Sequence, residues 1–197
     1  MIETLNGVQL YFEVHGSWSK DFQLIVADMR GHGRSSNPSK VFRHQDSAAD
    51  VFALLDHLKI GTLKGLGVSG GGSYFPAQAR PIMRQYPSSL TEQDWEMMRR
   101  RHPGGDARIK ALLASTASFA DSYDDMNFTP PYLSTIQART LIVQGDRDPL
   151  YPVEISVEMA KAIPQSSLWI IPNGGHGPIG GERWPEFVKT AAAFLRG

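Results

Sequence analysis

Short runs of apolar residues predict the strands of this chain. Val8–Val14 alternates between apolar and polar positions and is rich in residues that favour strands, as expected when one face is buried. The short apolar run Leu24–Ala27 predicts a buried strand, and Thr140–Gln144 predicts a clear strand further along the chain. Thr62–Val68 is a weaker candidate strand, and Leu168–Ile171 follows as another. The pattern therefore predicts about five strands.

Helical periodicity lies between these strands. Asp46 or Ser47 can cap the first of the helices, and Thr91 with Asp94 resembles a capping box before a later one. Because strands alternate with helices, we expect an α/β protein with a mostly parallel sheet. The apolar stripe of the first helix consists of Val51, Leu54, Leu55 and Leu58, and further helices are predicted after Asp106, over 153–163 and from Pro185 to Leu195.

The segment 73–135 interrupts the alternation. It contains six prolines, with helical stretches between them. We expect this segment to be a helical cap inserted into an α/β core that consists of residues 1–72 and 136–197, within a single domain.

Composition and charge exclude several classes of protein. The 197 residues include 20 basic and 20 acidic side chains, and this balance argues against a nucleic-acid binder or a polybasic membrane anchor. The absence of cysteine excludes disulfides, thiolate metal ligands and a cysteine nucleophile, and it fits a reducing compartment. No signal peptide is visible, and no apolar run approaches the roughly 18 residues of a membrane span. We therefore expect a cytoplasmic globular protein with no nucleic-acid partner and no membrane span.

The strongest local motif is Gly67–Gly71, which reads G-V-S-G-G and matches G-x-S-x-G. In such a motif a strand turns sharply, so that the hydroxyl of Ser69 projects from the carboxyl edge of the sheet. The flanking residues are small because the backbone is crowded there. The N–H of the next residue, Gly70, is then expected to point to the place where an oxyanion forms. Taken alone, the pattern also occurs in ordinary glycine-rich turns.

Two further motifs directly follow predicted strands. Gly145–Pro149 reads G-D-R-D-P, and Gly174–Gly177 reads G-G-H-G. Adjacent parallel strands would bring both loops to one edge of the sheet, where a carboxylate can orient the ring of His176. Asp148 is the candidate for that carboxylate, and Asp146 is its rival.

Together these motifs resemble the α/β-hydrolase fold family. Asp28–Ser35 reads D-M-R-G-H-G-R-S, which is similar to that family's D-x-R-G-x-G-x-S loop, and Asn6–Tyr11 resembles its first hairpin. The order of serine, acid and histidine along the chain is also that of the family. The resemblance covers residues 6–72 and 139–197, and it favours Asp148 over Asp146.

Two core segments of that family have no counterpart in the sequence. Only Gly16–Phe22 separates the first hairpin from Leu24–Ala27, where the family has a strand that leads to a second oxyanion donor. After Gly72, the family has a helix and another strand, whereas this chain enters the proline-rich segment. The loss of one oxyanion donor lowers the rate roughly a hundred- to a thousand-fold. An abridged sheet can also expose an apolar edge, which favours a homodimer.

The resemblance implies a serine hydrolase of the esterase-like branch, acting on a small-molecule ester. Ser69 would attack the acyl carbonyl, His176 would move the proton to the leaving group, and Asp148 would fix the imidazole tautomer. The Gly70 N–H would stabilise the oxyanion, and no metal or other cofactor is needed. We expect cleavage of a small carboxylic ester through an acyl-enzyme. The alternative is an impaired hydrolase-like remnant that binds a ligand or partner, or has no stable function.

Other interpretations of single motifs have less support. Gly65–Gly70 also spells G-x-G-x-x-G, but Pro76 interrupts the helix that a dinucleotide site requires. Asp28 and Arg30 are expected to form a structural loop pair. Five histidines show no metal-ligand spacing, so structural or surface roles are expected for His15, His32, His44, His57 and His102.

Overall fold

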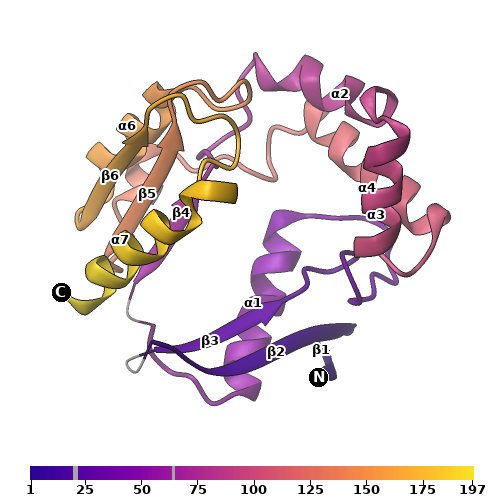
Figure 1. Ribbon diagram of the computed structural model, residues 1–197, viewed down its shortest axis with the longest axis horizontal. Coiled ribbons are helices and arrows are strands. Elements are labelled where there is room, and N and C mark those ends of the chain that lie inside the picture. The colour runs from indigo at the N-terminus through magenta and orange to yellow at the C-terminus, as the bar shows by residue number, and fades with distance from the viewer. Residues whose placement is uncertain (20–21, 64) are drawn as a thin grey trace. The chain divides into compact units, whose positions relative to one another are not determined.

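A computed structural model describes residues 1–19, 22–63 and 65–197 of the chain (Figure 1). The chain forms two compact units, which consist of residues 1–61 with 83–119, and of residues 62–82 with 120–197. The boundaries of the two units differ from the boundaries predicted between core and cap. The division into core and cap stays a prediction. The two units are described separately below.

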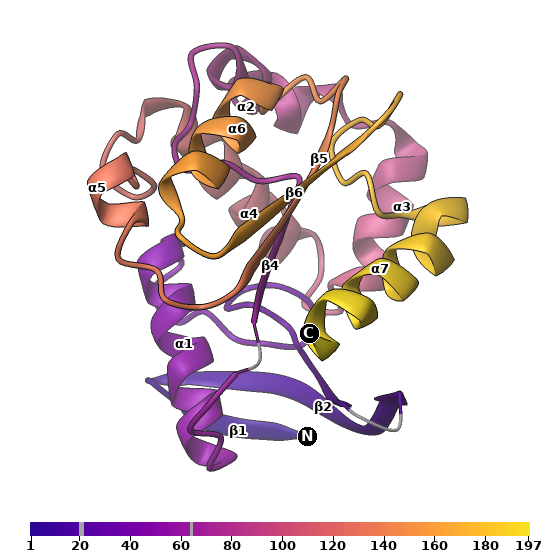
Figure 2. The same cartoon turned by 90° about the vertical axis from the view of Figure 1, so that its left-hand side faces the viewer.

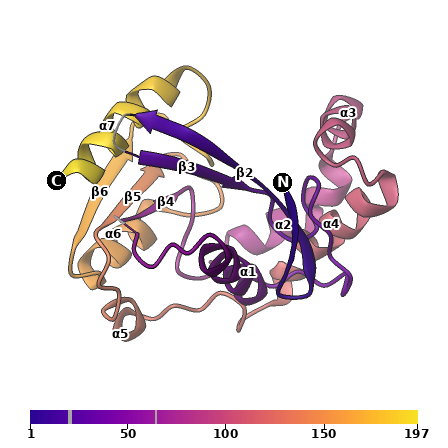
Figure 3. The same cartoon turned by 90° about the horizontal axis from the view of Figure 1, so that it is seen from below.

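An antiparallel sheet forms the start of the first unit. Its strands are β1 (Ile2–Leu5), β2 (Val8–Ser19) and β3 (Phe22–Ala27), in that spatial order (Figure 1). Figure 3 shows β2 and β3 side by side. Asn6 and Gly7 have φ angles of 48° and 76°, which allow the tight two-residue hairpin between β1 and β2. The strand predicted at Val8–Val14 is confirmed, and β2 extends beyond it.

The helix α1 (His44–His57) packs on this sheet. The buried side chain of Leu54 shares a hydrophobic cluster with Val8, Leu10 and Phe12, which alternate along β2 as predicted. Val51 is 49% exposed, so only part of the predicted stripe is buried.

The predicted cap of α1 is wrong. The helix begins at His44, ahead of both candidate capping residues, and Arg43 stands at the N-cap without a side-chain hydrogen bond. Asp46 therefore lies inside the first turn, where its negative charge still favours the helix dipole.

The strand β3 is confirmed, but the expectation that it is buried is wrong. Within the described residues β3 pairs only with β2, and Leu24 and Val26 are 37% and 47% exposed. A strand is buried only when both of its faces are covered, and an apolar sequence alone does not supply that cover.

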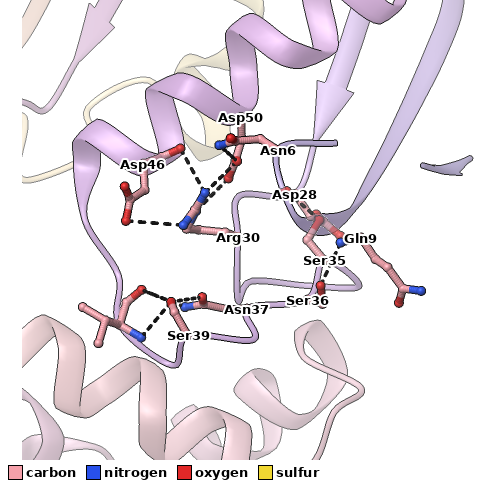
Figure 4. Close-up of polar contacts among 11 residues, drawn as sticks. Asn6, Gln9, Asp28, Arg30, Ser35, Ser36, Asn37, Ser39, Asp46 and Asp50 are labelled. Atoms are coloured by element: carbon pink, nitrogen blue, oxygen red, sulfur yellow. Dashed lines mark hydrogen bonds and ion pairs between the residues drawn. The ribbon is translucent and has the colours of Figure 1, made fainter. Parts of the chain in front are cut away.

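The loop after β3 is held by a buried ion pair (Figure 4). Arg30 donates to both carboxylate oxygens of Asp50, at 2.7 Å each, and also to the Asp46 carbonyl. Asn6 donates to Asp50 as well, at 2.8 Å. The carboxylate of Asp28 instead accepts from the N–H of Arg34. The loop is structural as expected, but the predicted pair of Asp28 with Arg30 is wrong, because Arg30 pairs across to α1.

Segment 73–135 carries the predicted helical stretches. They are α2 (Ala79–Ser89), α3 (Glu92–Arg101), α4 (Asp106–Ser118), the short 3-10 turn η1 (Phe119–Asp121) and α5 (Pro130–Leu133). The capping box of Thr91 with Asp94 is confirmed at the start of α3. Asp106 is the first residue of α4 and Gly105 is its N-cap, so the predicted cap is displaced by one position.

A parallel sheet forms the centre of the second unit. Its strands are β4 (Leu66–Ser69), β5 (Thr140–Gly145) and β6 (Ser166–Ile171), in that order. The helices α6 (Val153–Ala162) and α7 (Trp184–Arg196), the latter after the 3-10 turn η2 (Gly181–Arg183), lie on opposite faces of this sheet (Figures 1 and 2). The strand predicted at Thr140–Gln144 is confirmed as β5, and every residue of β5 is buried.

The α/β class is confirmed, with one correction to the sheet. The described strands form two three-stranded sheets, and only β4–β6 are parallel. The strands β1 and β2, joined by the two-residue turn at Asn6 and Gly7, pair antiparallel, and so do β2 and β3. Lys20 and Asp21 lie outside the described residues, within the stretch Gly16–Phe22 where a family strand is expected to be absent. Lys64, in the strand predicted at Thr62–Val68, also lies outside them. Across the described ranges, none of the helices has the length and apolar character that crossing a bilayer requires.

Candidate active site

The three predicted motifs lie at the carboxyl edge of the parallel sheet. Ser69 is the last residue of β4, whereas Asp148 and His176 lie in the loops that follow β5 and β6. The two loops are joined by backbone bonds, such as that from the Arg147 N–H to the Gly174 carbonyl at 2.9 Å. A Cβ at Gly145 would stand 2.2 Å from the Gly174 oxygen, so only glycine allows this approach. The prediction that both loops meet at one edge is confirmed.

Asp148 and His176 form a hydrogen-bonded pair. The distance from His176 Nδ1 to Asp148 Oδ2 is 3.1 Å, and the side chains are 46% and 0% exposed, respectively. A carboxylate accepts, so Nδ1 carries the proton and Nε2 is left as the acceptor. Asp146, the rival acid, is exposed, and its N–H is bonded to the Ile171 carbonyl. The structure thus brings Asp148 to the histidine.

Neutral donors hold the buried carboxylate of Asp148 in place. The N–H groups of Leu150 and Tyr151 donate to Oδ1 at 2.7 Å and 3.1 Å, and Gln144 Nε2 donates to Oδ2 at 3.0 Å. Burial by itself raises the pKa of Asp148. The hydrogen bonds from His176, the two N–H groups and Gln144 outweigh burial and hold the pKa below its ordinary value. Asp148 is therefore ionised at neutral pH, although it lacks solvent.

The ring of Tyr151 packs against the imidazole. The two ring centroids are 5.9 Å apart and the planes are inclined by 30°. Burial, with a smaller contribution from the Asp148 charge, raises the pKa of Tyr151 to about 12, so its hydroxyl stays protonated at neutral pH. A Cβ at Gly72 would lie 2.5 Å from this ring, which shows how closely the glycine turn approaches it.

The serine turn packs on the histidine loop. A Cβ at Gly70 would lie 2.8 Å from the Gly177 nitrogen, and Gly70 has a φ of 58°. Both observations require glycine at position 70. Ser69 itself is exposed at the strand end, and the hydrogen bonds found among the described residues do not include its hydroxyl.

The expected role of the Gly70 N–H is not supported by its geometry. This N–H donates to the Val143 carbonyl at 3.1 Å. The parallel ladder between β4 and β5 continues one residue past Ser69, so the group points along the sheet instead of toward a bound oxyanion. The prediction of Gly70 as oxyanion donor is wrong for this conformation.

The geometry of the site does not support the dinucleotide-binding interpretation of the glycine motif. A dinucleotide fingerprint needs a helix that opens directly after the glycines, but the next helix starts at Ala79. Within residues 1–19, 22–63 and 65–197, histidine and carboxylate side chains do not gather in groups of three that could hold a metal ion.

Sequence reasoning missed two residues of this site, Gln144 and Tyr151. Gln144 had a readable signal, because it is a polar residue at the end of an apolar strand and directly before the acid loop. Tyr151 had none, since a tyrosine before a proline is typical of many loops.

Solved structures share this fold. An esterase from Exiguobacterium antarcticum superposes with a TM-score of 0.75 and 18% identity, over 100% of this chain and 99% of its own. The enol-lactonase from Burkholderia xenovorans superposes with a TM-score of 0.74 and 19% identity, over 100% of both chains. The chain therefore has the α/β-hydrolase fold.

Sequence comparisons agree with the structural ones. An α/β-hydrolase family model described as TAP-like protein matches residues 124–196, and its match supports membership of the α/β-hydrolase family. A poly(3-hydroxyalkanoate) depolymerase of Ectopseudomonas oleovorans is 26% identical over 211 residues, covering 85% of this chain and 73% of the relative. A 3-oxoadipate enol-lactonase of Acinetobacter baylyi is 47% identical over 49 residues, covering 25% of this chain and 18% of the relative. These relatives are hydrolases.

The alignment with the depolymerase also bears on the abridged core. Its 211 aligned positions exceed the 197 residues of this chain, so the depolymerase has residues that this chain lacks. The chain is thus shorter than this relative in the aligned region, and the absence of the two core segments stays a prediction.

Proposed function

We propose that this chain is a serine hydrolase that cleaves a small carboxylic ester through an acyl-enzyme intermediate. The proposal rests on one observation: the buried, ionised Asp148 holds the Nδ1 proton of His176 at the sheet edge where Ser69 ends β4. The esterase and enol-lactonase neighbours act on ester bonds, as their names state, which supports this substrate class.

Each residue has a role that its surroundings favour. Nε2 of His176 accepts the Ser69 proton as the hydroxyl attacks the carbonyl, and later returns that proton to the leaving alcohol. Asp148 fixes the tautomer and stabilises the imidazolium. Water then cleaves the acyl-enzyme by the same route, with His176 as the base. The rate depends on oxyanion donors, and the Gly70 N–H is bonded to Val143 in this conformation.

That bonded N–H favours a second candidate function, an impaired hydrolase-like remnant that binds a ligand or partner. A site that keeps its acid and histidine but lacks an oxyanion donor loses roughly a hundred- to a thousand-fold in rate. Binding without turnover would distinguish the remnant from an active esterase.

A fluorophosphonate probe tests the nucleophile. We expect wild type to be labelled and Ser69→Ala to remain unlabelled, while Ser167→Ala, which removes another exposed serine of the same unit, is labelled like wild type. Hydrolysis of a short-chain aryl ester should be lost in His176→Ala. Equal labelling of wild type and Ser69→Ala would reject Ser69, and tight ligand binding without Ser69-dependent turnover would favour the remnant.

A further inference from the structure

A buried glutamine contacts the acid of the candidate site. The side chain of Gln144 is fully buried at the end of β5. Its Nε2 donates to Asp148 Oδ2 at 3.0 Å and to the Tyr151 carbonyl at 2.8 Å, and the Gly145 carbonyl lies at 3.4 Å. The orientation of this amide is determined by its neighbours, because a flipped amide would place Oε1 against three oxygen atoms.

The same orientation leaves a polar atom without a partner. Gln144 Oε1 is buried, and no hydrogen bond reaches it from any residue in the described part of the chain. A buried acceptor without a donor destabilises the folded state. A methionine would fill a similar volume without that cost, but it would leave Asp148 Oδ2 and the Tyr151 carbonyl without this donor.

The two carboxylate oxygens of Asp148 are held from different sides. Oδ1 accepts from the backbone of Leu150 and Tyr151, whereas Oδ2 accepts from Gln144 and from His176. Without Gln144, the imidazole would be the only group among the described residues left to fix Oδ2, although Oδ2 is the atom that has to orient the imidazole. Gln144 thus supplies an anchor that does not depend on the proton carried by His176.

We propose that Gln144 is a positioning residue for the Asp148–His176 pair, one that fixes Oδ2 of the acid through its amide. This inference rests on the proposed function for its catalytic consequence, but its structural part does not. The amide donates regardless of the protonation of His176, so the acid keeps its place while the imidazole gains and loses a proton.

Gln144→Met, compared with Gln165→Met as control, tests the proposal. Gln165 is exposed in the same unit and donates only to the distant Gln137 carbonyl. We expect the pKa of Asp148, followed by carboxyl NMR titration, to rise by about one unit in Gln144→Met and to stay unchanged in the control. Ester hydrolysis should lose about 10- to 100-fold in kcat, with KM unchanged, as for other partners that orient a functional side chain.

The two proposals fail in different ways. If wild type does not hydrolyse the ester, the proposed function fails, while the Asp148 titration still decides the role of Gln144. An Asp148 pKa in Gln144→Met equal to that of wild type would overturn the positioning role, whatever the turnover.

Gln144→Glu provides a second variant in case the methionine variant does not fold. In this variant, the introduced carboxyl group and that of Asp148 would share a proton at low pH, and both would ionise as the pH rises. We expect its activity relative to wild type to fall with rising pH, and a constant ratio would contradict the proposal.

Discussion

Asp50 and Asp148 are both buried carboxylates, one in each compact unit, and their partners differ. Asp50 is paired with the permanently charged Arg30, whose guanidinium contacts both of its oxygens. Asp148 has no such cation within the described residues. Backbone N–H groups, an amide and a histidine hold it instead.

This difference distinguishes a structural acid from one suited to chemistry. The charge of Asp50 is paired with that of Arg30, and this pair joins the loop after β3 to α1. The charge of Asp148 is solvated by neutral dipoles, and its other partner among the described residues is the half-exposed imidazole of His176. An imidazole beside such a carboxylate can gain a proton and be stabilised as it does so.

The largest expected effect is a loss of turnover on substitution of Asp148 that substitution of Asp50 does not cause. Asp148→Asn should lower the kcat for a short-chain aryl ester about 10⁴-fold, since the asparagine amide favours the wrong imidazole tautomer. Asp50→Asn should leave turnover per folded molecule close to wild type. The measurement is steady-state kinetics, normalised to the folded fraction from circular dichroism. Similar losses in both variants would remove the distinction.

Sequence patterns predicted much of this site because the three candidate catalytic residues lie at or after strand ends. Ser69 ends β4 next to Gly70, and Asp148 and His176 lie in glycine-containing loops after β5 and β6, where the local sequence determines the turn. The pairing of Arg30 with Asp50 had no such signal, because it depends on the rotation of α1 against the sheet. The hydrogen bond of the Gly70 N–H and the edge position of β3 could not be predicted from the sequence either. Both depend on which strand pairs with the segment, and strand pairing is a tertiary property.

For the free energy of unfolding, we expect the larger loss at the Asp50 ion pair and the smaller loss at Asp148. Arg30→Met leaves Asp50 buried without its cation and should cost about 3–5 kcal/mol of unfolding free energy. Asp148→Asn keeps most of its hydrogen-bond partners and should cost about 1 kcal/mol. Urea denaturation measures both.

A double variant provides the control for the ion pair. Arg30→Met with Asp50→Leu should regain most of the loss, because no buried charge then remains. If the double variant is as unstable as Arg30→Met, the ion pair is not the source of the effect.

Acid should destabilise the site around Asp148. The pKa of this carboxyl is lowered in the folded chain, so its contribution to stability is fully present above its ordinary value near 3.8 and is lost as the pH falls through the folded value. Protonation weakens hydrogen bonds to a charged group, which amounts to about 2 kcal/mol. The unfolding free energy of wild type should therefore fall more between pH 5 and pH 3 than that of Asp148→Asn. Parallel curves would show that the charge of Asp148 is not stabilised by its surroundings.

The smallest effect concerns His102, a titratable group of the first unit. Its Nδ1 accepts the Gly33 N–H at 2.9 Å, so a proton on that nitrogen would break the bond. Burial lowers the pKa of His102, and the nearby His32, Arg108 and Arg101 add to this, while the Asp28 charge acts against it. The neutral ring therefore stabilises the fold above pH 6.5, and this contribution is lost as the pH falls through the lowered value.

His102→Gln tests this contribution, because the amide oxygen can accept the Gly33 N–H but does not titrate. Between pH 7.5 and pH 5, wild type should lose about 1 kcal/mol more unfolding free energy than the variant. His57→Gln, at an exposed histidine of the same unit, should follow the wild-type curve. A flattened curve in His57→Gln, or an unchanged slope in His102→Gln, would assign the pH response to another group. With the expected result, the first unit has a titratable residue that serves structure alone, whereas His176 has its second nitrogen left for chemistry.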